Sequence, residues 1–267
     1  MVETTAREID ANGTRLYVET TGSGAPLVFV HGFSLDTRMW DDQWEPFAER
    51  FRVIRYDLRG FGRSAQPTDQ YYRHADDLAG LLDALEIERA HVVGLSLGGA
   101  VTLDFALAHP GRAHSIVLVD AVLPGFSTPD LDEAIRAVWG PARTLPLDAV
   151  KELWLGSPLF AGAMADPVVA ERVRRMVTEF SGYGWVARDP GRWVEPLASG
   201  RLGEIQAPAL AIVGEGDLPG FHAIAERIAA EVPGARKAIL PGCGHLPNME
   251  APHAFNAALA EFLGGEK

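Results

Sequence analysis

The chain has few of the features that mark secreted or membrane-bound proteins. Cys243 is the one cysteine among 267 residues, so no disulfide can form within the chain. No apolar run reaches about 18 residues, the length that a membrane-spanning helix needs. The first ten residues are polar and lack the apolar segment of a secretory signal. These absences predict a cytoplasmic protein.

Positive charge is also scarce. Lysine and arginine total 24 against 36 aspartates and glutamates, which gives a formal net charge of −12. Because an acidic surface repels phosphate backbones and anionic lipid heads, we expect neither nucleic acid nor a membrane as partner. No metal-ligand spacing and no phosphate-binding loop appear. The sequence therefore predicts no cofactor and no metal, and a small molecule as the partner.

Short apolar runs alternate with segments of helical periodicity. An Asn12-Gly13 turn precedes Tyr17 to Thr20 and predicts an N-terminal hairpin. Predicted strands then follow at Pro26–Val30, Val53–Tyr56, His91–Gly94, Ser115–Val119, Ala209–Val213 and Ala235–Leu240. Predicted helices are Tyr72–Leu85, Gly98–Ala108, Phe221–Glu231 and Pro252–Leu263. This order favours an α/β fold with a mostly parallel sheet covered by helices on both faces.

The stretch 124–199 interrupts this alternation. It contains eight prolines and four of the six tryptophans, Trp139, Trp154, Trp185 and Trp193. We interpret it as a helical lid inserted into a core formed by residues 1–123 and 200–267. A packed subdomain with no role in binding is the alternative. The aromatic residues favour a lid, because large apolar side chains need a surface to cover.

A candidate nucleophile lies between the third predicted parallel strand and the helix that follows it. Gly94-Leu95-Ser96-Leu97-Gly98 fits the pattern G-x-S-x-G in a strand–turn–helix context. A sharp turn lifts the serine hydroxyl away from the sheet, and small neighbours let the chain approach closely. An ordinary small-residue turn would give the same letters. The position between strand and helix favours Ser96 as the nucleophile.

The loop after the first parallel strand is a candidate oxyanion hole. His31-Gly32-Phe33 follows the run Pro26–Val30. We expect the backbone N–H groups of Phe33 and Leu97 to face the reacting carbonyl oxygen. A simple turn at the strand end is the alternative, and His31 is predicted to be structural.

The general base and its partner acid are expected downstream of the serine. Among the eight histidines, His245 alone lies in a glycine-containing loop after the last strand, which favours it as the base. Asp217 follows the strand Ala209–Val213 and is predicted to orient His245. Asp120, at the end of an earlier strand, and Glu215, two residues before Asp217, remain alternative acids.

Five segments together resemble the α/β-hydrolase superfamily: His31–Phe33, Asp57–Ser64, Gly94–Gly99, Gly214–Asp217 and Gly244-His245. They occur in family order along nearly the whole chain. The resemblance is to the branch of bacterial carboxylesterases, enol-lactonases and cofactor-free haloperoxidases. It implies a mostly parallel eight-stranded sheet and a lid between the sixth and seventh strands. Since the nucleophile is serine, the resemblance does not extend to haloalkane dehalogenases, which use aspartate.

The leading functional hypothesis is a serine hydrolase that cleaves a small to medium carboxylic ester or lactone through an acyl-enzyme. Enol-lactone hydrolysis, carbon–carbon bond hydrolysis and haloperoxidase or perhydrolase chemistry on the same triad are alternatives. A non-catalytic ligand-binding receptor on the same fold is a further class. Trp139 and Trp154 are the candidate walls of the substrate pocket. The stretch 124–199 holds eight Lys and Arg against ten Asp and Glu, which does not favour an anionic substrate.

Overall fold

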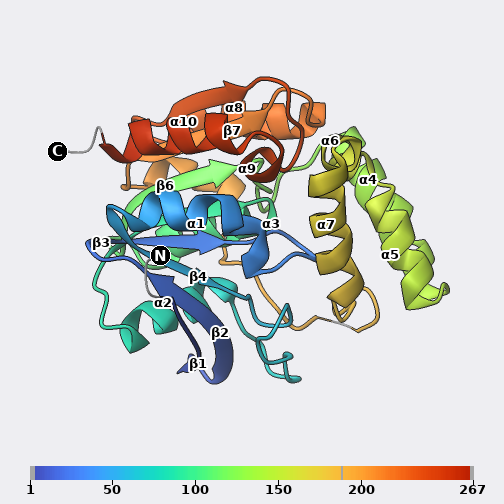
Figure 1. The fold of residues 1–267 in the computed structure, drawn as a ribbon, viewed down its shortest axis with the longest axis horizontal. Helices are drawn as coiled ribbons and strands as arrows, with labels where there is room; N and C mark the ends of the chain where they lie inside the picture. Colours follow the sequence, from blue (N-terminus) through green and yellow to red (C-terminus); the bar gives the residue numbers. More distant parts are fainter. Residues whose placement is uncertain (1–3, 188, 265–267) are drawn as a thin grey trace.

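The computed structural model describes residues 4–187 and 189–264, and its centre is one eight-stranded sheet (Figure 1). The strand order is β1-β2-β4-β3-β5-β6-β7-β8. Strands β1 and β2 pair antiparallel with each other, and β2 pairs antiparallel with β4, whereas every later pairing is parallel. The bounds are β1 Thr5–Ala11, β2 Thr14–Thr21, β3 Ala25–Val30, β4 Phe51–Tyr56, β5 Ala90–Leu95, β6 Ala113–Val119, β7 Ala209–Gly214 and β8 Arg236–Leu240.

The central strands consist of continuous apolar runs because helices cover both faces of the sheet. All six residues of β5 are buried, as are all six of β7. Helix α1 (Asp41–Ala48) packs against α10 (Pro252–Gly264), whereas α2 (His74–Ala84) packs against α3 (Leu97–Ala108). Helix α8 (Pro219–Glu231) covers β7 and β8. The predicted α/β fold class is confirmed, and each predicted strand is present.

Two short helices were not predicted from the sequence. One of them is α1, which contains Pro46. Proline inside a sequence usually predicts the end of a helix, but α1 forms around it. The 3₁₀ turn η1 (Thr37–Trp40) precedes it, and the single-turn helix α9 (Pro247–Glu250) follows the predicted base. Both helices are too short to show a clear apolar period, which explains why pattern analysis missed them.

A helical segment joins β6 to β7. It contains α4 (Pro129–Trp139), α5 (Leu147–Leu155), α6 (Ala161–Ala165) and α7 (Pro167–Glu179). Figure 1 shows these helices together at one end of the molecule, on the side to which the arrows of β3 and β6 point. That end is the carboxyl edge of the parallel strands, where ligands of open α/β sheets bind.

Candidate active site

The topology gathers the predicted triad at the carboxyl edge of neighbouring strands. Ser96 directly follows β5, Asp217 lies three residues after β7, and His245 lies in the loop after β8. The order β5-β6-β7-β8 places these strand ends side by side. Residues about 150 positions apart in the chain therefore meet at one edge.

Ser96 adopts the strained backbone of a sharp strand-to-helix turn. Its φ is 54° and its ψ is −111°, a conformation that a residue with a Cβ rarely adopts. Its N–H donates to the carbonyl of Val119 at 2.9 Å, and its own carbonyl accepts from the N–H of Val122 at 3.1 Å, so the end of β6 and the segment after it hold the turn. The side chain is only partly buried, and hence a substrate can reach it.

The glycines on either side of Ser96 are sterically required. A Cβ at Gly94 would clash with the carbonyl oxygen of Gly98, and a Cβ at Gly98 would clash with the carbonyl oxygen of Val30. The helix that begins at Leu97 can therefore start directly beneath the serine. The G-x-S-x-G pattern predicts this close approach of the backbone segments on either side of Ser96.

His245 and Asp217 form a direct hydrogen bond. The distance from His245 Nδ1 to Asp217 Oδ2 is 2.7 Å, and both side chains are almost completely buried. Asp217 Oδ1 also accepts from the N–H of Leu218 at 2.8 Å. Burial alone would raise the pKa of the Asp217 carboxyl, but the charge and hydrogen bond of His245 hold that pKa below its usual range.

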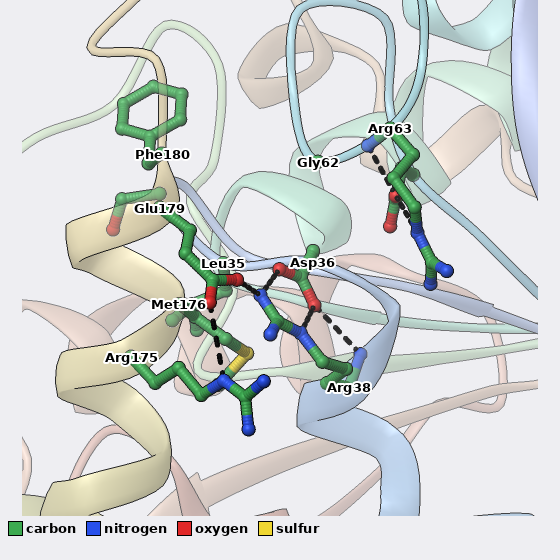
Figure 2. Close-up of a pocket in the computed structure, with 11 residues that line it drawn as sticks. Leu35, Asp36, Arg38, Gly62, Arg63, Arg175, Met176, Glu179 and Phe180 are labelled. Carbon is green, nitrogen blue, oxygen red and sulfur yellow. Dashed lines mark hydrogen bonds and ion pairs between the residues drawn. The ribbon is translucent and has the colours of Figure 1, made fainter.

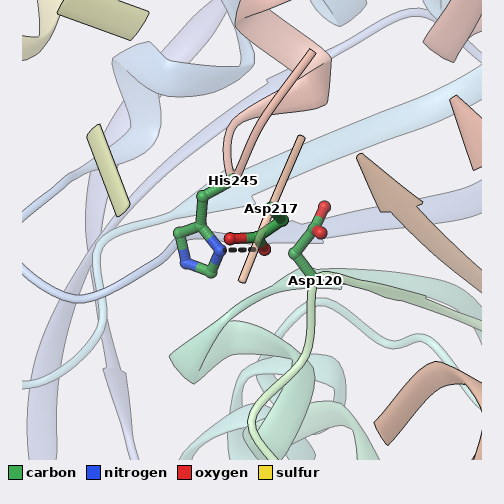
Figure 3. A group of neighbouring side chains, drawn as sticks. All are labelled: Asp120, Asp217 and His245. Carbon is green, nitrogen blue, oxygen red and sulfur yellow. Dashed lines mark hydrogen bonds and ion pairs between the residues drawn. The ribbon is translucent and has the colours of Figure 1, made fainter. Parts of the chain in front are cut away.

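The two alternative acids, Glu215 and Asp120, differ in their position relative to His245. Glu215 is exposed and accepts from the N–H of Gly242, away from His245. Asp120 is buried beside Asp217, and one atom from each of Asp120, Asp217 and His245 lies within 4.8 Å of the others (Figure 3). Of the three acids, Asp217 is the one with a hydrogen bond to the imidazole in the described part of the chain.

The loop that carries His245 is held by a residue that the sequence analysis missed. Glu250 on α9 accepts from the N–H of Gly244 at 2.6 Å and from the N–H of Leu246 at 2.9 Å, one on each side of the histidine. The ring of Phe221 packs 4.4 Å from the imidazole centroid. Within residues 4–187 and 189–264 no hydrogen bond joins Ser96 Oγ to His245. Catalytic hydrogen bonds are often long before substrate binds, so this does not argue against the pair.

The predicted oxyanion loop lies against Ser96. A Cβ at Gly32 would stand 3.6 Å from the Cβ of Ser96, so the backbone that leads to Phe33 borders the serine. Leu97 is the first residue of α3, where helix N–H groups lack partners within the helix. Among the described residues, the amides of Phe33 and Leu97 have no hydrogen-bond acceptor in the protein. Both donors are thus available to a ligand.

His31 has the structural role that the sequence predicted. Its Nε2 accepts from the N–H of Leu58 at 2.9 Å, and its Nδ1 lies 2.8 Å from the carbonyl oxygen of Gly32. A nitrogen that accepts from an amide carries no proton, so Nδ1 must carry it and donate. Burial lowers the pKa of the imidazole, which keeps it neutral. His31 therefore ties the oxyanion loop to the segment Asp57–Ser64.

The candidate pocket tryptophans surround Phe33. The rings of Trp139 and Trp154 lie 5.0 and 5.8 Å from the Phe33 ring, and their centroids are 5.6 Å apart. Trp154 is buried and its Nε1 donates to Ser34 Oγ at 2.6 Å, whereas Trp139 is only partly buried. Phe180 and Trp185 complete this aromatic cluster. The segment between β6 and β7 thus packs directly on the oxyanion loop.

A cavity of about 180 Å³ opens beside the two candidate oxyanion donors. Its apolar lining consists of Phe33, Leu97, Phe61 and Trp193. Its polar lining comes from His74, Asp189 and Arg192. From the sequence, Trp193 is predicted only as part of the segment 124–199, and no pattern distinguishes Phe61 or His74. These residues come from separate segments of the chain, and a residue pattern does not show that such segments meet.

A second, larger cavity of about 350 Å³ lies where the oxyanion loop meets α7 (Figure 2). Figure 2 shows the Arg38 guanidinium bonded to both Asp36 and Glu179, with Arg175 on the other side of Glu179. Its arginines therefore already have carboxylate partners. These ion pairs tie α7 to the core and leave little charge for a ligand.

Comparison with known proteins identifies the family of this chain. Residues 27–258 match the model of the alpha/beta hydrolase family. The chain belongs to this family. A 2-hydroxymuconate semialdehyde hydrolase from Pseudomonas sp. (strain CF600) is 32% identical over 96% of this chain and 93% of its own. The fold class and the resemblance predicted from sequence are thereby confirmed.

Two solved structures of α/β hydrolases are similar along almost the whole chain. A thermophilic esterase from Thermogutta terrifontis is 30% identical, covers 97% of this chain and 98% of its own, and has a TM-score of 0.83. The enol-lactonase from Burkholderia xenovorans LB400 is 28% identical, covers 97% and 100%, and has a TM-score of 0.81. Relatives with hydrolase names support an enzyme of this family, and they differ in the bond that they cleave. In the described part of the chain, no helix is long and apolar enough to cross a membrane.

Within residues 4–187 and 189–264, Asp120, Asp217 and His245 form a group whose ligand atoms are close enough together to be considered as a metal site. Metal ligation would require an unprotonated His245 Nδ1, and the 2.7 Å bond to Asp217 calls for a proton there. We therefore expect EDTA to leave activity unchanged. The check is an assay before and after chelation. Loss of activity that zinc or calcium restores would contradict the cofactor-free prediction.

Proposed function

We propose that this α/β hydrolase cleaves a small to medium carboxylic ester or lactone through an acyl-enzyme on Ser96. The observation that carries the proposal is the 2.7 Å hydrogen bond between His245 and Asp217 at the strand edge where Ser96 also lies. A histidine oriented by a buried carboxylate is the base that a serine hydroxyl needs, because serine is a weak nucleophile at neutral pH.

Each residue has a defined part in the proposed mechanism. Ser96 Oγ attacks the substrate carbonyl while His245 Nε2 takes its proton, and Asp217 stabilises the imidazolium that forms. The amides of Phe33 and Leu97 donate to the oxyanion of the tetrahedral intermediate. His245 then protonates the leaving alkoxide. Water, deprotonated by the same imidazole, attacks the acyl-enzyme. The second tetrahedral intermediate collapses to the free acid, and His245 returns the proton to Ser96 Oγ.

The substrate class follows from the cavity beside the oxyanion donors. A volume of about 180 Å³ with aromatic and aliphatic walls suits a short apolar group on the carbonyl carbon. We propose that the segment 124–199 acts as a lid over this site, with the core formed by residues 1–123 and 200–267. The packing of Trp139 and Trp154 on Phe33 supports this division.

Carbon–carbon bond hydrolysis is the second candidate. It is favoured by the 32% identity to a 2-hydroxymuconate semialdehyde hydrolase along most of both chains. Substrates of that kind carry a carboxylate, and Arg192 is among the residues that line the cavity. Asp189 lines the same cavity, however, which weakens the attraction for an anion.

The test is a panel run under one set of conditions. It contains p-nitrophenyl esters from acetate to decanoate, simple lactones and 2-hydroxymuconate semialdehyde. We expect kcat/KM to be highest for a short ester or a lactone. A preference for the semialdehyde would replace the ester proposal by the carbon–carbon one. Absence of turnover on every substrate, with none of them forming an adduct on Ser96, would favour a receptor.

The tryptophans should control which acyl chain fits. Neither Trp139 nor Trp154 lines the cavity directly, but both rings pack on Phe33, which does. Trp139→Ala is expected to shift preference towards longer esters, because the Phe33 wall loses its support and can move away from the cavity. Trp154→Ala should act in the same way, but at a loss of about 3–5 kcal/mol in stability, because this buried indole also donates to Ser34. The measurement is the acetate-to-decanoate profile beside a thermal melt. Early melting with the parent profile in both variants would make the two residues structural.

A further inference from the structure

A second carboxyl lies behind the candidate acid, and the proposed mechanism does not use it. Asp120 follows β6 and is 1% exposed. Its φ of 40° lies in the left-handed region, which costs energy for any residue other than glycine and is tolerated best by Asn and Asp. Its N–H donates to the carbonyl of Ile212 at 2.9 Å, which fixes the backbone between β6 and β7. The fold therefore holds this buried acid in a defined place.

The two oxygens of Asp120 are not equivalent. Oδ1 accepts from the N–H of Gly214 at 3.0 Å. Oδ2 is shielded from solvent and has no hydrogen-bond partner within the described part of the chain. Figure 3 shows the Asp217 carboxylate between this side chain and the imidazole of His245. A buried oxygen without a donor, close to a second carboxylate, is an unfavourable place for a negative charge.

We propose that Asp120 carries a proton at neutral pH and donates it, as a hydrogen bond, to the carboxylate of Asp217. Asp120 is then a positioning residue, which fixes the acid that orients His245. This inference rests on the proposed function, because there Asp217 is the acid and Ser96 the nucleophile. Two ionised carboxylates this close in a buried site would repel each other strongly, and one shared proton removes that repulsion.

The surrounding groups agree with a neutral Asp120. Burial, and then the negative charge of Asp217, raise the pKa of the Asp120 carboxyl well above its usual range. Glu250 adds a further negative charge nearby, and burial also raises the pKa of the neighbouring Cys243 thiol, to about 12. His245 becomes a cation when it takes a proton, and Asp217 lies between it and Asp120. The proton shared with Asp120 thus leaves Asp217 as the ionised partner of His245.

Asparagine is the decisive substitution, because its amide resembles a protonated carboxyl. In Asp120→Asn the oxygen can still accept from Gly214 while the NH₂ donates to Asp217. We expect kcat within about tenfold of the parent and an unmoved acidic limb of the kcat/KM–pH profile. Asp120→Ala loses the donor, and kcat should fall by about tenfold to hundredfold, the range for one hydrogen bond to a charged group.

A matched control is available in Asp104. It is also a buried carboxyl that accepts from one backbone N–H, that of Val194, and one of its oxygens is likewise without a partner among the described residues. It lies on α3, outside the cluster of Asp120, Asp217 and His245. Asp104→Asn should leave the acidic limb unchanged and, unlike Asp120→Ala, should keep the parent kcat.

Two results would overturn the proposal. If Asp120 were ionised, Asp120→Asn would remove a negative charge near the imidazole and move the acidic limb down by about 1–3 pH units. If asparagine and alanine reduced kcat equally, donation to Asp217 would not be the role of this residue. A ¹³C NMR titration of labelled aspartate carboxyls measures the protonation state of Asp120 without any need for turnover. The Asp120 signal is the one that disappears in Asp120→Asn. It therefore still decides the proposal if Ser96→Ala shows that the proposed function is wrong.

Discussion

Replacing Ser96 with alanine is expected to lower kcat by about 10⁴–10⁶-fold and to leave the fold intact. The change removes one oxygen atom. In the described part of the chain that oxygen makes no hydrogen bond, so its loss leaves no buried partner unsatisfied. The backbone strain at φ 54° is the same for alanine as for serine. Activity should therefore fall for chemical reasons, with an unchanged melting temperature.

A covalent label makes the Ser96 prediction specific. A fluorophosphonate should modify the parent enzyme once, on the peptide that contains Ser96, and should not modify Ser96→Ala. Retention of activity within tenfold of the parent, or labelling of another serine, would remove Ser96 from the mechanism. Residual activity above the uncatalysed rate is expected, because the amides of Phe33 and Leu97 still stabilise an oxyanion.

The parts of the fold predicted well from sequence are those with a local physical cause. The buried strands contain apolar runs of the length that a covered sheet requires, so β3 to β7 could be located within a few residues. Gly94 is needed because a Cβ there would clash with the carbonyl oxygen of Gly98, four residues further along the chain. Such a constraint acts on neighbours in the chain, and the motif therefore identifies the turn before the fold is known.

The parts that could not be predicted depend on contacts between distant segments. Nothing near Glu250 in sequence shows that its carboxylate binds the amides on both sides of His245. The aromatic packing of Trp154 on Phe33 joins residues more than 100 positions apart. From the sequence, Asp120 is an alternative to Asp217, whereas the structure places the two side by side. A pattern can identify an acid at a strand end, but not whether a second acid lies beside it.

Replacing Asp217 with asparagine should be the most damaging change among the acids, with a loss in kcat of about 10⁴-fold. The amide can still accept from the N–H of Leu218, so the loop should keep its shape. Its NH₂ group can instead face Nδ1 of His245, which then becomes an acceptor and leaves the proton on Nε2. An imidazole in that tautomer cannot take the proton of Ser96.

Three single substitutions compared at one pH separate the candidate acids. Asp217→Asn should lose about 10⁴-fold, Asp120→Asn should remain within about tenfold because it retains a donor towards Asp217, and Glu215→Gln should change little because its side chain is exposed and faces Gly242. Thermal melts identify any variant that fails to fold. Should Asp120→Asn prove more damaging than Asp217→Asn, the working acid would be the one that follows β6. The 2.7 Å contact of His245 with Asp217 would then be a resting arrangement that the enzyme leaves before reaction.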